Sequence, residues 1–81
     1  MVEGNMDEGF ILSNKYRKAV LYELASGEYD IGRIAKKHHI IPMIVRRVVD
    51  EFVEGGVLEK NGSRYILTRK GEKLVMRIGK Q

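Results

Sequence analysis

Residues 57–68 read VLEKNGSRYILT, and this stretch decides the expected fold. An NGS tripeptide at positions 61–63 separates two short runs of β-prone residues, 57–60 and 64–67. Asn-Gly between two such runs is a strong short-range signal for a hairpin, because both residues tolerate positive φ. The stretch therefore predicts an antiparallel β-hairpin with a tight turn, inserted between segments of helical periodicity.

The helix expected before the hairpin spans residues 42–54. Pro42 suits a first helical turn, because its missing N–H would be unpaired there anyway. Val45, Val49 and Phe52 recur at the spacing of one helical face and are expected to point into the core. A pair of glycines then ends the helix. The face opposite these apolar residues is expected to be left free.

Two further helices are expected before residue 42. The first is expected over residues 14–25 with Ser13 as its N-cap, and the second over residues 31–38 with Asp30 as its N-cap. Only about four residues (38–41) connect the second helix to the third. A connection of that length is typical of a helix-turn-helix.

The predicted order of elements is α-α-α-β-β-α, a mainly α architecture with a small β part. The last helix follows Thr68, its expected cap, and a minimal extra strand is expected at residues 28–29, between the first two helices. Residues 1–9 are polar and acidic and are expected to form a flexible leader. Residues 10–81 then form the one domain that 81 residues allow.

Basic residues concentrate in the later part of the chain. The formal net charge is +4, but residues 1–29 carry three basic and five acidic side chains, whereas residues 30–81 carry twelve and six. An excess of positive charge in one part of a fold is what a polyanion-binding face needs. An ordinary solvated surface is the alternative.

Composition argues against several classes of function. The chain has no cysteine, which excludes disulfides and thiolate metal sites. His38 and His39 are adjacent, so on a helix they point about 100° apart and cannot share a metal. No phosphate loop, nucleophile elbow or pocket for an acid–base pair is recognisable. We therefore expect no enzyme, no cofactor, no metal and no small-molecule substrate or effector pocket.

No signal for a membrane or for export is recognisable either. The N-terminal residues are acidic, unlike a signal peptide, and the longest apolar run (residues 40–45) is too short to cross a bilayer. A cytoplasmic protein is therefore expected.

A helix-turn-helix places its second helix in the major groove of DNA. The expected readers of base edges or phosphates on the free face of residues 42–54 are Met43, Arg46, Arg47 and Asp50. Further phosphate contacts are expected from Lys36 and Lys37 on the preceding helix, and from Lys60, Asn61 and Arg64 at the hairpin tip. Arginine in such a position can form two parallel hydrogen bonds to guanine, and cations on the hairpin neutralise phosphates. A helical bundle without a ligand is the alternative.

Three stretches resemble the winged helix-turn-helix domains of archaeal and bacterial transcription regulators of the ArsR/MarR-like superfamily. They are IGRIAKK (31–37), VRRVVDEFVEGGVLE (45–59) and YILTRKGEKL (65–74). The resemblance covers residues 13–78 and implies a DNA-binding transcriptional regulator, often a homodimer. It implies that residues 42–54 lie in the major groove of double-stranded DNA and that residues 57–67 form a wing on the backbone or minor groove.

Apolar residues outside the expected core leave the oligomeric state open. Val75 and Ile78 on the last helix are candidates for a homodimer contact. The patch at residues 10–12 is another, unless it docks onto the core of its own chain. The resembling regulators often use long flanking helices to dimerise, and no such helices are expected within these 81 residues.

Two other functions remain compatible with the same fold, because fold does not fix function. One is a protein–protein interaction module, whose surface would combine the acidic patch Asp50, Glu51 and Glu54 with Ile44 and Val48. The other is a non-specific DNA- or RNA-binding protein. Ile44 and Val48 are more simply expected to complete the core, with thymine methyl groups or a partner subunit as alternatives. Glu51 is expected to pair with Arg47, four residues before it.

Overall fold

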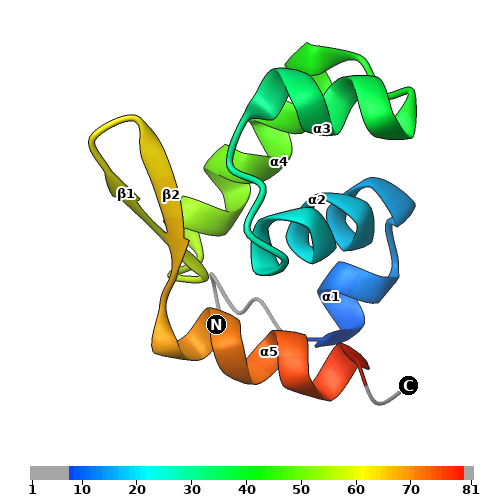
Figure 1. Cartoon of the computed structure of the whole chain (residues 1–81). Coiled ribbons are helices and arrows are strands. Elements are labelled where there is room, and N and C mark those ends of the chain that lie inside the picture. Colours follow the sequence, from blue (N-terminus) through cyan, green and yellow to red (C-terminus); the bar gives the residue numbers. More distant parts are fainter. Residues whose placement is uncertain (1–7, 80–81) are drawn as a thin grey trace.

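The computed structural model describes residues 8–79, which form five α-helices and one β-hairpin (Figure 1). The elements are α1 (Glu8–Leu12), α2 (Lys15–Ala25), α3 (Ile31–His38), α4 (Pro42–Glu54), β1 (Leu58–Asn61), β2 (Arg64–Leu67) and α5 (Arg69–Gly79). The expected mainly α architecture with a small β part is confirmed, as are the bounds of α3 and α4. No helix between residues 8 and 79 has the length and hydropathy that a membrane span requires.

Helix α2 lies at the centre of the molecule (Figure 1). Helices α3 and α4 lie on one side of it, α1 and α5 lie on the other, and the hairpin projects beside α4. Helix α2 contacts all four other helices and β2. The largest side chains that are fully buried are Phe52, Ile11, Ile34, Leu58, Val20, Val45, Val49 and Val57. The core therefore joins α4 and the start of the hairpin to the central helix.

The first helix, α1, was not predicted, and it changes the expected start of α2. Asn14, not Ser13, caps α2, because its side-chain oxygen accepts hydrogen bonds from the backbone N–H groups of Tyr16 (2.8 Å) and Arg17 (3.2 Å). The Ser13 hydroxyl instead donates to the carbonyl oxygen of Phe10 (2.8 Å), in the last turn of α1. The prediction of Ser13 as the cap was therefore wrong by one residue.

Helix α1 also takes up the end of the expected leader. It begins at Glu8 and packs against α2 and α5, with Ile11 fully buried. The apolar patch at residues 10–12 therefore docks onto the core of its own chain. Residues 1–7 of the expected leader lie outside the described residues.

The connection between α3 and α4 depends on local capping. Asp30 caps α3 as predicted, accepting hydrogen bonds from the N–H groups of Gly32 (2.8 Å) and Arg33 (3.3 Å). His39 then reverses the chain in the left-handed conformation, with φ of 56°. Pro42 occupies the start of α4, as expected. The two helices are thereby joined by only three residues.

The hairpin turn is one residue shorter than the expected connection at residues 61–63. Asn61 pairs with Arg64 and Leu58 pairs with Leu67, so the two turn residues are Gly62 and Ser63. Of these two residues only Gly62 has a positive φ, at 66°, which is the pattern of a type II′ turn. Asn61 belongs to the sheet and not to the turn, because it is the last residue of β1.

The extra strand expected at residues 28–29 is absent, and the described residues form a two-stranded sheet only. Backbone N–H groups in this segment are already bound locally. Glu28 donates its N–H to the carbonyl oxygen of Glu23 (3.0 Å), and Asp30 donates its N–H to the Glu28 side chain (3.0 Å). The segment contacts the hairpin through a cation–π interaction instead. The Arg64 guanidinium lies 4.6 Å from the centre of the Tyr29 ring.

Thr68 and Gly71 fix α5 against the base of the hairpin. Thr68 caps α5 as predicted, because its hydroxyl oxygen accepts the N–H of Gly71 (3.1 Å). The same hydroxyl donates to the carbonyl oxygen of Gly56, and the Thr68 N–H donates to that of Val57 (3.0 Å). A Cβ at Gly71 would collide with the Val57 carbonyl oxygen and would lie 2.9 Å from a methyl group of Leu67. Glycine therefore permits the close approach of α5 to the chain just before β1.

We expect Gly71→Ala to destabilise the protein, although alanine is the better helix former. The added methyl group overpacks a backbone contact, which typically costs about 1–3 kcal/mol. In a domain of this size, each kcal/mol lowers Tm by roughly 4–8 °C. Thermal unfolding followed by circular dichroism measures the shift. Gly79→Ala is the matched control on the same helix, because a Cβ there meets nothing within 4 Å. Equal Tm values for the two variants would contradict the role of Gly71.

Candidate nucleic-acid interface

Helix α4 presents two faces of opposite character. Val45, Val49 and Phe52 are fully buried, as predicted from their spacing. The opposite face carries exposed side chains, and these are the four expected readers, Met43, Arg46, Arg47 and Asp50. Among residues 8–79, neither arginine takes part in a salt bridge. Both guanidinium groups are therefore free to bind a ligand.

A groove of about 730 Å³ runs between α4 and the hairpin. Arg46 reaches it from α4, Lys60 from β1 and Tyr65 from β2, while Tyr29 and Gly32 line it from the segment around the start of α3. Residues far apart in the sequence thus place two cations and two aromatic rings around one concave surface, together with Asp30, whose carboxylate caps α3.

The other expected contacts of the hairpin lie on its second face. Side chains alternate along a strand, so Lys60 and its partner Tyr65 point to one side, and Asn61 and its partner Arg64 to the other. The Arg64 guanidinium stacks on the ring of Tyr29. Stacking uses the face of the guanidinium and leaves its N–H donors at the edge available. Lys60, Asn61 and Arg64 are all exposed.

The two lysines expected to contact phosphates from α3 differ in their surroundings. Lys36 is exposed and has no salt-bridge partner within the described part of the chain. The ammonium group of Lys37 lies 3.1 Å from a carboxylate oxygen of Glu23. Lys36 is therefore free for a ligand, whereas Lys37 already has a partner inside the protein.

Glu23 is a buried carboxylate that the sequence analysis did not single out. Only 4% of it is exposed, and one of its oxygens lies 2.7 Å from His38 Nε2. The hydrogen bond with His38 lowers the pKa of Glu23, and Lys37 lowers it further, which together outweigh the opposing effect of burial. These contacts hold the last turn of α3 against α2. The sequence offered one signal for its burial. Glu23 follows Val20 by three residues and precedes Leu24, so it lies on the apolar face of α2.

The acidic patch expected on α4 is only partly an independent surface. Glu51 pairs with Arg17 of α2, with 3.2 Å between Oε1 and Nε, and the expected pair with Arg47 is not formed. Val48 is buried and Ile44 is partly buried against the core. Their expected role in the core is confirmed. Most of the apolar part of the expected protein-interaction surface is therefore covered, since only Ile44 keeps some exposure.

The described residues contain no cluster of three or more His, Asp or Glu side chains that could hold a metal ion. His38 is engaged with Glu23, and His39 is exposed at the turn before α4. Comparison with protein-family models, curated proteins and solved structures finds no match for the chain. An assignment of function therefore depends on the geometry of the groove beside the hairpin and on the unpaired charges around it.

We expect Glu23→Gln to lower stability at neutral pH and to change its pH dependence. A hydrogen bond to a charged group contributes about 1.5–3 kcal/mol. The pKa of Glu23 lies below its ordinary 4.5 in the folded chain, so its carboxylate stabilises the fold above that pH. The contribution disappears as the pH falls through the lowered pKa. The unfolding free energies of wild type and variant should therefore differ at pH 7 and converge in acid.

Denaturant unfolding between pH 7 and pH 2 measures this convergence. Glu59→Gln is the control, because Glu59 is exposed and has no salt bridge to any residue from 8 to 79. A constant difference between wild type and Glu23→Gln across this range would contradict the role of the carboxylate charge.

Proposed function

We propose that this chain is a winged helix-turn-helix protein that binds double-stranded DNA as a cytoplasmic transcriptional regulator. Helices α3 and α4 form the helix-turn-helix, α4 is the recognition helix, and β1 and β2 form the wing. One observation carries the proposal: Arg46 of α4 and Lys60 of the hairpin line the same groove. The exposed face of α4 and the hairpin can then meet one polyanion together.

The side chains on α4 suit the edges of base pairs. An α-helix fits the major groove of B-form DNA, where an arginine can bind O6 and N7 of guanine. Arg46 and Arg47 supply such groups, Asp50 can accept a hydrogen bond from cytosine N4, and Met43 offers an apolar contact to a thymine methyl group. Met43 is 66% exposed, which is unusual for methionine and is consistent with such a contact.

The hairpin suits the phosphate backbone. Lys60 and Arg64 are exposed cations on its two faces, close to the turn at Gly62. Contacts to phosphates position a protein on the duplex without reading its sequence. Lys36 on α3 adds a further free cation. We therefore assign base reading to α4 and backbone binding to the hairpin and α3.

Duplex RNA is a less suitable partner than duplex DNA. The major groove of A-form RNA is deep and narrow, and side chains cannot read it. A protein-interaction module is also less well supported, because burial of Val48 and partial burial of Ile44 leave little of the apolar part of the expected surface accessible. Duplex DNA is the partner that fits a free helix face flanked by a basic hairpin.

We expect Arg46→Ala and Arg47→Ala each to weaken binding to a preferred sequence by about 1–3 kcal/mol, because each removes a contact to a base edge. The preferred sequence is first selected from a random duplex library at two salt concentrations. Gel shifts of the selected and of scrambled duplexes then measure the loss, which should be larger for the selected one. Retention of full affinity by both variants would show that this face does not bind DNA.

We expect Lys60→Ala and Arg64→Ala to weaken binding to all duplexes alike. Each removes a phosphate contact, so the slope of log K against log salt should become shallower by about one. Fluorescence anisotropy at several salt concentrations measures the slope. Lys73→Ala on α5 is the control, because Lys73 is exposed but does not line the groove. Slopes unchanged from wild type, or tighter binding to a competing RNA duplex, would contradict the proposal.

A further inference from the structure

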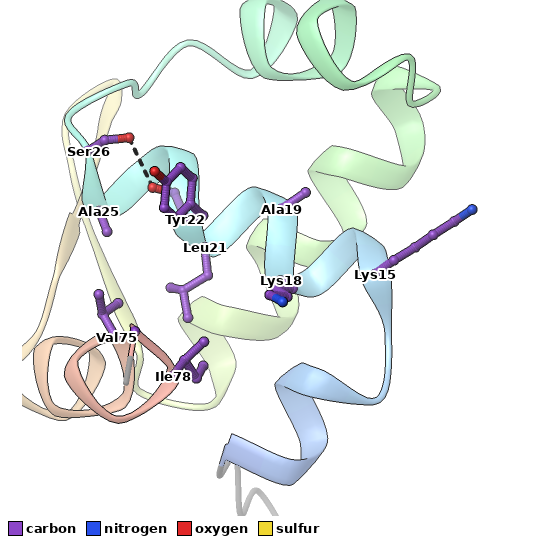
Figure 2. A pocket seen from close by; sticks show the side chains of 10 residues that line it. Lys15, Lys18, Ala19, Leu21, Tyr22, Ala25, Ser26, Val75 and Ile78 are labelled. Carbon is purple, nitrogen blue, oxygen red and sulfur yellow. Dashed lines mark hydrogen bonds between the residues drawn. The ribbon is translucent and has the colours of Figure 1, made fainter. Parts of the chain in front are cut away.

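A second groove, of about 590 Å³, lies between α2 and α5 (Figure 2). Leu21 of α2 and Val75 and Ile78 of α5 point into the space between the two helices. The groove shares no lining residue with the one beside the hairpin. It is therefore a separate feature of the protein, and one that the sequence did not reveal.

The walls of this groove are apolar and partly exposed to solvent. Leu21 is buried, whereas Val75 and Ile78 are only partly buried against the core. Tyr22 is 68% exposed beside them, and its ring lies at the edge of the groove in Figure 2. A pocket of a few hundred cubic ångströms with apolar walls and a few polar groups is typical of small-molecule sites.

The charges around the groove have one sign. Lys15 and Lys18, from the first turn of α2, belong to its lining, and no Asp or Glu does. Neither lysine has a salt-bridge partner among residues 8–79. The ammonium group of Lys15 lies 5.5 Å from the centre of the Tyr16 ring and is otherwise directed outwards. An anionic group bound at this end would gain charge-assisted hydrogen bonds.

We propose that the groove binds a small amphiphilic carboxylate, a ligand with an apolar body and one carboxylate group. The body contacts Leu21, Val75 and Ile78, and the carboxylate pairs with Lys18 and, once its exposed side chain rotates towards the groove, with Lys15. The typical range for ligand pockets, about 300–1,000 Å³, includes the volume of this groove. The proposal does not rest on DNA binding, because it uses none of the residues assigned to that function.

A second copy of the chain is a less suitable occupant. A two-fold contact places the same surface on both sides of the interface. Centred on this groove, it would bring Lys15 and Lys18 of both copies together without a carboxylate in either lining. Like charges at an interface are unfavourable. The charge of the rim therefore favours an anion over a symmetric dimer.

The test is a titration of the isotopically labelled full chain with 2-naphthoate, followed by amide chemical shifts. Its neutral analogue, 2-naphthalenemethanol, has the same ring system and serves as the matched probe. Saturable shifts should map to α2 and α5 and leave α4 and the hairpin unchanged. Loss of the charged contact should weaken binding about tenfold, both for the alcohol and for the Lys15→Gln/Lys18→Gln variant with naphthoate.

Lys73→Gln, on α5 but outside the lining, should bind naphthoate like wild type. Both lysines of the test variant are exposed, so the fold should be retained, and circular dichroism checks this. Three results would overturn the proposal: equal affinity for acid and alcohol, undiminished binding by the double variant, or a concentration-dependent dimer whose interface covers α2 and α5. None of them bears on DNA binding, so the two proposals fail independently.

Discussion

Burial of one face of α4 is the constraint on which the rest of the structure depends. Val45, Val49 and Phe52 lie within two helical turns and are withdrawn completely from water. A helix of 13 residues with that face fixed against α2 has no rotational freedom left about its own axis. The polar side chains on its opposite face must therefore project away from the core. The direction of Arg46 is thus set by apolar residues that are themselves fully buried.

The hairpin obtains its position from backbone contacts at the other end of the same helix. The Val57 N–H donates to the carbonyl oxygen of Phe52, and the Val57 carbonyl accepts from Thr68. Helix α5 then approaches this carbonyl so closely that only glycine fits at position 71. These contacts orient the two strands relative to α4 and leave their far end free. The groove between α4 and the hairpin is consequently a product of packing at its base.

Sequence reasoning succeeded where the determining interaction is local. Asp30 and Pro42 mark helix starts through their own side chains, so the starts of α3 and α4 could be predicted. Helix α1 is too short to show a periodic pattern, and the pairings of Glu23 with His38 and of Arg17 with Glu51 join residues 15 and 34 positions apart. The turn at Gly62 follows from strand register, which burial of Leu58 helps to fix. Such features depend on tertiary packing. The two grooves could not be predicted either, because each is lined by residues from separate parts of the sequence.

Net charge is a poor guide to the candidate binding sites of this protein, because tertiary packing decides which cations are paired within the fold. Arg17, Arg33 and Lys37 pair with carboxylates, and the Lys70 ammonium donates to the Gly55 carbonyl oxygen, so these cations serve the fold. Lys73 and Arg77 are exposed on α5 but line neither groove. A cation marks a binding site when it is unpaired and also faces a concave surface. Arg46 and Lys60 are unpaired and line one groove, and Lys15 and Lys18 are unpaired and belong to the lining of the other, although the Lys15 ammonium is directed outwards. The overall +4 is therefore less informative than the division of free cations between two faces, one proposed to bind duplex DNA and the other an amphiphilic carboxylate.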